Sequence, residues 1–249
     1  MKIKYIPNND IRIKEFNSFI LNNFPTLLTE KNPEIFLIAG GDGTMLRAIH
    51  DTIDTGIPYL GKAMGTFNFL LSNFNNDKEI IQNLIDDKIK LHIFKSYAIK
   101  AILNGKKLGE AVNDVILGEK LTGYHSFSIS TKNRDLNNFE LKGSGICIST
   151  PIGSTAFNFN NNGRILPLDS NLLSITGIVC NRFLNDIVPF EDIKIKSNGA
   201  KIYLSNVESK ILKENDELIL SRGSEIQLAF LNKQKFIKKR IEIGHRYRK

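Results

Sequence analysis

The sequence predicts an N-terminal α/β domain followed by a mostly antiparallel β domain. Residues 34–39 form a short continuous apolar run, which is typical of a strand buried on both faces. Helical apolar stripes alternate with strand-like segments over the first 89 residues. Beyond residue 90, short alternating segments and tight-turn dipeptides replace them.

The N-terminal elements alternate between strand and helix. In order they are a strand over 2–6, a helix from a cap at Asn9 to about Asn23, a strand over 34–39, a helix ending at Thr55-Gly56, a strand over 58–62 and a helix over 77–88. Because each helix separates two strands, the order predicts a parallel sheet with right-handed crossovers and helices packed on it.

The pattern of the remaining chain predicts mainly strands. Residues 91–103 alternate and lead into Asn104-Gly105, the dipeptide of a tight hairpin turn. Further β-type segments are expected at 111–117, 127–131, 145–150, 200–204, 217–221 and 225–230, with a single helix over 169–178. We therefore predict domains over 1–89 and 90–230, the second a β-rich dinucleotide-binding domain, with a tail over about 231–249 that can pack back on the first.

The composition is that of an ordinary globular protein without special cofactor sites. No segment has the pattern of a secretory signal or the length of a membrane span, so a cytoplasmic location is expected. Cys147 and Cys180 stand singly among apolar residues and read as small buried hydrophobes. The four histidines lack ligand spacing, which argues against a structural zinc site.

The net charge of +8 leaves open a non-enzymatic alternative, a basic nucleic-acid-binding module. Its candidate element is the C-terminal run Lys233–Arg240, continued by Arg246, Arg248 and Lys249. The other lysines are dispersed among acidic residues, and a positive site also suits an enzyme that binds phosphates. We therefore expect no nucleic-acid partner. A strongly salt-dependent affinity for RNA would favour the alternative.

The strongest local signal is the pentad Gly40-Gly41-Asp42-Gly43-Thr44, placed between a buried strand and a helix. Glycines let backbone N–H groups approach a phosphate, and the helix start presents free N–H donors to an anion. Asp42 then projects at the carboxyl edge of the sheet, where open α/β folds bind ligands. The competing interpretation is a turn whose Asp only caps the helix.

The pentad resembles a motif shared by NAD kinases, diacylglycerol and sphingosine kinases, and phosphofructokinases. The choice among these families rests on residues 143–157, GSGICISTPIGSTAF, which are similar to an NAD kinase segment ending in TPTGSTAY. Asn113-Asp114 resembles the Asn-Glu pair of that family, and residues 65–70 resemble its GxLGFL loop. Together these blocks, in the family's order, identify the chain as similar to NAD kinases along most of its length.

The resemblance implies a C-terminal domain that is β-sandwich-like, a site between the domains, and a homodimer or homotetramer. It implies that NAD and ATP are the substrates and that a divalent cation, Mg²⁺ or Mn²⁺, comes with ATP rather than from a dedicated protein site. It makes Asp42 the general base for the 2′-hydroxyl of the adenosine ribose. An ordinary Asp is too weak to ionise an alcohol beforehand, but in a loose transition state the proton leaves late and positioning dominates.

The resemblance also assigns the nucleotide contacts. Gly43 and Thr44 would hold phosphate oxygens, Asn113 and Asp114 would meet the adenosine and its ribose, and Lys142 would supply charge. The full set of expected nucleotide-binding residues is Asp42, Gly43, Thr44, Phe69, Asn113, Asp114, Lys142, Ser144, Ile152, Thr155, Ala156, Phe157, Asn158, Phe159 and Asn160. Simpler roles remain open for three of them: Thr155 as a helix cap, Phe157 as core and Lys142 as a surface charge.

Several positions depart from the family pattern, and most of them concern dinucleotide recognition. They are Asp114 for Glu, Ser144 for Asp, Phe157 for Tyr, Ala63 for Asn, Asn68 for Gly and Asn206 for Asp. The donor stays open among ATP, another triphosphate and polyphosphate, and the acceptor between NAD and NADH. The alternative enzyme is a lipid or other small-alcohol kinase, although no interfacial amphipathic helix is evident.

Overall fold

The computed structural model describes residues 1–65, 68–118, 124–131, 141–205 and 207–246. The chain divides into two units: unit 1 comprises Met1–Lys95 and Ile226–Lys249, and unit 2 comprises Ser96–Glu225. The chain passes between them within two strands, β4 (His92–Leu103) and β14 (Leu218–Phe230). None of the helices in these ranges is both long and apolar enough to cross a membrane.

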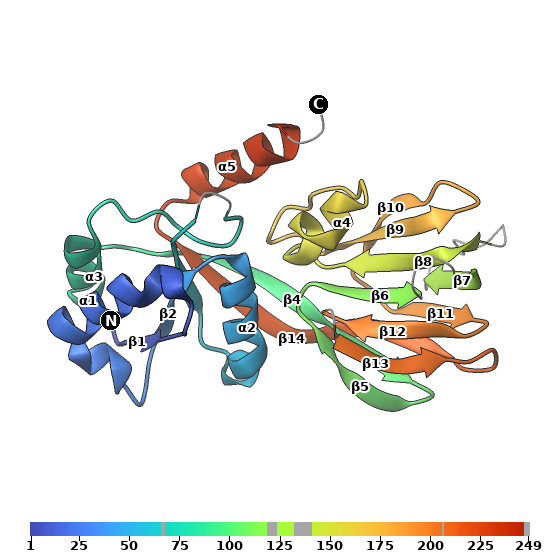
Figure 1. The fold of residues 1–249 in the computed structure, drawn as a ribbon, viewed down its shortest axis with the longest axis horizontal. Coiled ribbons are helices and arrows are strands. Elements are labelled where there is room, and N and C mark those ends of the chain that lie inside the picture. Colours follow the sequence, from blue (N-terminus) through green and yellow to red (C-terminus); the bar gives the residue numbers. More distant parts are fainter. Residues whose placement is uncertain (66–67, 119–123, 132–140, 206, 247–249) are drawn as a thin grey trace. The chain divides into compact units, whose positions relative to one another are not determined.

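Unit 1 is a parallel sheet with helices. Its strands run in the order β1-β2-β3-β14, and every pair is parallel (Figure 1). The strands are β1 (Ile3–Ile6), β2 (Ile35–Gly40), β3 (Tyr59–Ala63) and the end of β14; the helices are α1 (Lys14–Asn23), α2 (Asp42–Thr52), α3 (Asp77–Ile85) and α5 (Lys233–Arg246), with short 3₁₀ turns at Ile11–Ile13, Pro25–Leu28 and Ile53–Thr55.

Strand β2 is buried along its whole length because helices cover both of its faces. Leu37 belongs to the core that α1 and α3 close with residues such as Phe16 and Ile81. On the other face, the Tyr59 hydroxyl lies 3.0 Å from the Thr52 hydroxyl of α2. The continuous apolar run at 34–39 thus forms the two-sided buried strand that it predicts.

Unit 2 consists mostly of antiparallel strands around one apolar core. The order is β14-β11-β7-β8-β6-β12-β13; β9 adds to β8, β10 to β9, and β4 pairs with β5 and β14. The remaining strands are β5 (Lys106–Ala111), β6 (Asp114–Gly118), β7 (His125–Thr131), β8 (Leu141–Ser149), β9 (Leu172–Cys180), β10 (Asn185–Pro189), β11 (Ile193–Ser197), β12 (Ala200–Leu204) and β13 (Val207–Leu212); a 3₁₀ turn (Gly153–Thr155) and the short helix α4 (Phe157–Asn160) follow β8. The predicted fold class is confirmed.

The hairpin between β4 and β5 also follows its sequence. Asn104 and Gly105 have φ of 49° and 78°, the left-handed values that a tight two-residue turn requires. Leu103 pairs with Lys106 directly across this turn.

The helix predicted over 169–178 is wrong, because this segment forms strand β9 at Leu172–Cys180. A short apolar run fits a buried helix and a buried strand equally well by periodicity, and β-branched Ile175, Ile178 and Val179 favour the strand. The strands predicted at 217–221 and 225–230 are one continuous strand, β14.

Candidate active site

The turn from β2 into α2 depends on its glycines. Gly40 has φ of 150°, and a Cβ there would lie 2.7 Å from the Thr44 hydroxyl oxygen, so both backbone and space require glycine. The helix begins at Asp42, and the Gly41 carbonyl accepts hydrogen bonds from the amides of Thr44 (3.0 Å) and Met45 (3.1 Å). Gly43 is exposed, and a Cβ there would meet no atom within 4 Å.

The Asp42 carboxylate is held by a second loop of unit 1. The Phe69 amide donates to Oδ1 at 3.0 Å and Oδ2 at 2.8 Å, and the Leu70 amide donates to Oδ1 at 2.9 Å. Two consecutive backbone donors therefore fix the carboxylate and stabilise its negative charge. The structure brings Asp42 and Phe69 together. Thr66 and Phe67 of the same predicted loop lie outside the described residues.

Arg240 of α5 is a buried cation in the same unit as Asp42. Its side chain is buried, with only 5% exposed. Burial lowers the pKa of Arg240 to about 10, while the negative charge of Asp42 opposes that change. Because 10 is far above neutral pH, the guanidinium keeps its charge.

A cavity of about 570 Å³ opens beside the start of α2. Its lining includes Gly43, Thr44 and, one turn later, Arg47 of α2, together with Asp51 and with Ile6–Asp10 and Arg12 at and after the end of β1. The cavity lies where β1 and β2 end, the edge at which open α/β sheets bind ligands. A helix N-terminus and a guanidinium both favour anions, so this cavity suits the phosphates of a nucleotide.

In unit 2, Asn113 and the turn after β8 form a second group. The Thr150 amide donates to the Asn113 carbonyl at 2.9 Å, and the Thr150 hydroxyl donates to the Val112 carbonyl at 2.7 Å. A Cβ on Gly153 would come within 2.1 Å of the Asn113 carbonyl oxygen, so only glycine permits this contact. The predicted residues Asn113, Asp114, Ile152 and Thr155 therefore share one end of β6 and β8.

Two buried side-chain oxygens at this end lack partners. Among the residues that the structure describes, neither Oδ1 of Asn113 nor Oδ1 of Asp114 accepts a hydrogen bond. Burial raises the pKa of Asp114 to about 6. Buried polar atoms are nearly always hydrogen-bonded, so two adjacent exceptions mark a place where a ligand with hydroxyl or amino donors fits.

The predicted contacts at 156–160 form or adjoin the short helix α4. Phe157 and Asn160 are exposed, and Ala156 and Phe159 are half-buried. Asn158 is fully buried: its amide donates to the carbonyls of Ser154 (3.1 Å) and Arg164 (3.0 Å), and its oxygen accepts from Ser174 (3.0 Å). The Asn158 side chain thus holds the turn together from inside the protein.

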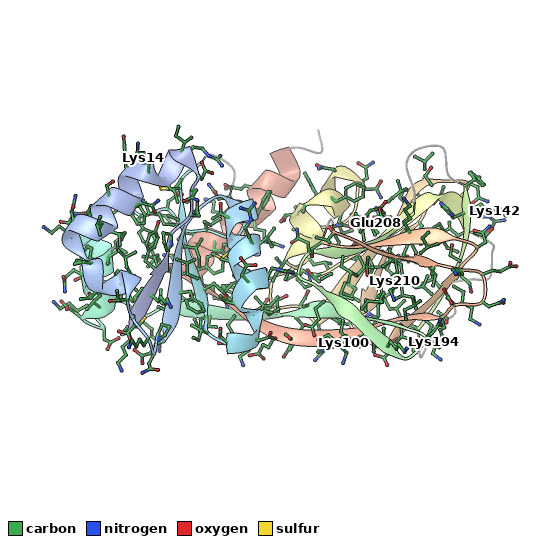
Figure 2. All side chains as sticks on the ribbon, turned by 60° about the horizontal axis from the view of Figure 1, so that its bottom comes forward. Lys14, Lys100, Lys142, Lys194, Glu208 and Lys210 are labelled. Carbon is green, nitrogen blue, oxygen red and sulfur yellow. The ribbon has the colours of Figure 1, made fainter. Side chains whose placement is uncertain are left out.

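Lys142 and Ser144 lie elsewhere along β8. Asp114 pairs with Ser149 at the end of this strand, whereas Lys142 stands at its start (Figure 2). At about 3.3 Å per residue, Ser144 is roughly 17 Å and Lys142 roughly 23 Å from Ser149. Within unit 2 the structure does not bring them to Asn113 and Asp114. Their nucleotide contacts stay predictions.

No group of three or more His, Cys, Asp or Glu side chains in the described part of the chain is arranged to hold a metal ion.

Sequence reasoning missed Arg12, Arg47 and Arg240. Arg47 carried a usable signal, because it stands three and four residues after Thr44 and Gly43 and so shares their helix face. Arg240 stood within a basic run and carried none.

Comparison with known proteins shows what the chain is similar to. A family model described as the ATP-NAD kinase N-terminal domain matches residues 11–91. The NAD kinase of Rickettsia rickettsii (strain Sheila Smith) is 32% identical over 146 residues, 58% of this chain and a little over half, 56%, of that relative. The NAD kinase of Zymomonas mobilis is 27% identical over 211 residues, covering 79% of this chain and 80% of the relative.

Two solved structures share the fold. Yeast NADH kinase complexed with NADH superposes with a TM-score of 0.78 at 18% identity, covering 97% of this chain and 86% of that one. An NAD kinase from Archaeoglobus fulgidus in complex with ATP gives 0.73 at 15% identity, covering 98% and 99%. The chain thus resembles NAD kinases: residues 11–91 match their N-terminal domain, and the Zymomonas mobilis enzyme aligns over four fifths of its own length.

Proposed function

We propose that the protein transfers a phosphoryl group from ATP to the 2′-hydroxyl of the adenosine ribose of NAD, producing NADP. The observation that carries the proposal is the Asp42 carboxylate, held by the amides of Phe69 and Leu70 at the start of α2, where its helix also meets a cavity suited to phosphates. The resemblance of the chain to NAD kinases, and the NADH and ATP complexes of its structural neighbours, support the same substrates.

Asp42 serves as the general base. Its carboxylate orients the ribose hydroxyl and accepts its proton late, as the bond to phosphorus forms. A loose transition state requires little basicity, so an ordinary carboxylate suffices if its position is fixed. The two amide donors supply that fixed position.

Gly43 and Thr44 bind donor phosphate oxygens through the helix start, and Arg47 offers a guanidinium in the same cavity. A divalent cation that accompanied the triphosphate would neutralise charge on its oxygens. Magnesium in kinases typically binds one or two carboxylates together with substrate phosphates. The same cavity is lined by Asp10 and Asp51, so its side chains fit a cation that the nucleotide carries.

Asn113 and Asp114 recognise the dinucleotide. Their buried oxygens accept hydrogen bonds from its hydroxyl or amino groups, which would satisfy both atoms at once. The turn at 150–155 packs against Asn113 and Asp114 and fixes their backbone. Residues 155–160 offer further contacts through exposed Phe157 and Asn160.

We also propose that the protein works as a homo-oligomer. Strand β13 ends the order of strands in unit 2 and exposes Val207 (66%) and Ile211 (48%), apolar side chains that association would bury. Light scattering on the pure protein tests this, and a monomer at micromolar concentration would contradict it.

The activity is tested by incubating the pure protein with NAD or NADH, a panel of phosphoryl donors, and magnesium or manganese. We expect NADP or NADPH, with ATP among the effective donors. A folded preparation that makes neither, while phosphorylating a lipid or a sugar, would refute the assignment.

A further inference from the structure

Strand β3 carries a lysine that is almost completely buried. Lys62 is only 8% exposed, and the residues before it, Tyr59 to Gly61, are buried as well. Lysine is almost never buried unless its charge is paired, because the ammonium group loses the stabilisation of water. An apolar side chain would fill this position without that cost, so packing alone does not explain the lysine.

One carboxylate and two aromatic rings surround the Lys62 ammonium. Nζ lies 2.6 Å from Oδ1 of Asp77, the first residue of α3. It also lies 5.3 Å from the centroid of the Phe74 ring and 5.4 Å from that of the Phe16 ring in α1. Oδ1 of Asp77 is buried and accepts no hydrogen bond of regular geometry from the described residues, so the ion pair is what compensates this oxygen.

The ion pair joins the two ends of the segment that holds Asp42. Lys62 directly precedes residues 63–76, and Asp77 directly follows them. The two backbone amides that donate to the Asp42 carboxylate, at 2.8 to 3.0 Å, lie midway along this segment. The segment is therefore a loop closed at its base by the ion pair.

The loop is also attached to β3 by backbone hydrogen bonds. The Ser72 amide donates to the Gly61 carbonyl at 2.8 Å, and the Ser72 carbonyl accepts from the Ala63 amide at 2.9 Å. These bonds hold the residues that follow the contact with the carboxylate. Lys62 holds the loop again where it enters α3, through the ring and the carboxylate of the two residues described above. Together the two attachments limit the positions that the two amides can take.

We propose that Lys62 and Asp77 are positioning residues for Asp42: their ion pair closes the loop at 63–76 and so holds the two amides where they fix the carboxylate for the ribose hydroxyl. The inference rests on the proposed function, because the pair takes part in the reaction only through the base. Neither residue lines the cavity assigned to the phosphates, so the pair acts on the rate of transfer rather than on donor binding.

The test compares Lys62→Met, Asp77→Asn and the double variant with the wild type. Methionine is unbranched and can still contact the aromatic rings, but it carries no charge. Each protein is measured well below its unfolding midpoint for kcat, for both KM values and, by NMR, for hydrogen exchange at the Phe69 and Leu70 amides.

Leu27→Ala is the matched control for lost stability. Leu27 is 4% exposed and belongs to the core of the same unit. It lies in the 3₁₀ turn Pro25–Leu28, which packs against β1 and α1, and β1 is separated from β3 by β2. The truncation therefore destabilises unit 1 at a place remote from the loop.

We expect Lys62→Met to lower kcat by about 10- to 100-fold, the scale of a displaced catalytic group, with little change in the KM for ATP. Exchange at the two amides should become several-fold faster, because a loop released at its base opens more often. The double variant should lose no more than Lys62→Met, since both changes break the same ion pair. Leu27→Ala should lower the unfolding midpoint but keep the wild-type kcat and the wild-type exchange at these amides.

A wild-type kcat in Lys62→Met would overturn the inference, and so would an equal loss of kcat in Leu27→Ala. Losses that multiply in the double variant would show that Lys62 and Asp77 act separately, which contradicts a shared role. The exchange rates separate this inference from the proposed function. If the wild type makes no NADP, the proposed function fails, but faster exchange in Lys62→Met would still show that the ion pair holds the amides that bind Asp42. Unchanged exchange would contradict that as well.

Discussion

Gly43→Ala tests whether glycine at this position is needed for folding or for binding the phosphates. In the structure a Cβ on Gly43 meets no atom within 4 Å, and the residue lies in α2 without a left-handed φ. Alanine should therefore stabilise the protein by about 0.4–1 kcal/mol, because it restricts the unfolded chain and favours helix. A phosphate that approaches the Gly43 amide would meet the new methyl group, and a displacement of about 1 Å can cost roughly 10²-fold in rate.

We therefore expect a higher urea midpoint together with a kcat/KM for ATP lower by up to about 10²-fold. Gly105→Ala is the matched control, because Gly105 also has open space but a φ of 78°. It should destabilise the protein by roughly 1–2 kcal/mol and leave the kinase rate unchanged. Full activity in Gly43→Ala would show that no phosphate approaches this residue, and the donor site would have to be placed elsewhere.

Two further substitutions test the base and the buried carboxyl. Asp42→Asn should lower kcat by about 10²–10⁴-fold with little change in NAD affinity, measured by steady-state kinetics. Near-normal turnover would show that Asp42 takes no part in the chemistry. The folded pKa of Asp114, about 6 against an ordinary 3.8, lies above the unfolded one. The stability that protonation of Asp114 contributes is therefore present below about pH 4 and lost as pH rises through 6. The loss amounts to about 3 kcal/mol in the free energy of unfolding. Asp114→Asn should raise the unfolding free energy at pH 8 by up to that amount and leave it unchanged near pH 4. The NAD affinity of the wild type should fall below pH 6. An Asp114→Asn variant that keeps the wild-type NAD affinity would contradict the role of Asp114.

Local features were predictable where the backbone itself dictates the residue. The apolar run at 34–39, the glycines before α2 and Asn104-Gly105 each specify one conformation, and the structure has all three. Strand β9 was mistaken for a helix, because its environment on the sheet, rather than its period, decides its conformation. Local sequence patterns therefore predict single elements better than they predict which elements pack against them.

The candidate site was predictable only in part, for the same reason. Asp42 and Phe69 stand 27 residues apart, and the motif resemblance alone suggested that both serve the site. Arg12 and Arg47 stand 35 residues apart and line one cavity, and no local pattern links them. Asn158 was predicted to contact the nucleotide, yet packing within the protein buries its side chain completely.

The central claim is that Asp42 directs a phosphoryl group from ATP to the adenosine ribose of NAD. Transfer of label from γ-³²P-ATP, followed by digestion of the product to locate the phosphate, tests this most directly. We predict labelled NADP carrying the phosphate on the 2′-oxygen, formed by the wild type and nearly absent with Asp42→Asn. Label on another hydroxyl, or equal labelling by both proteins, would contradict it.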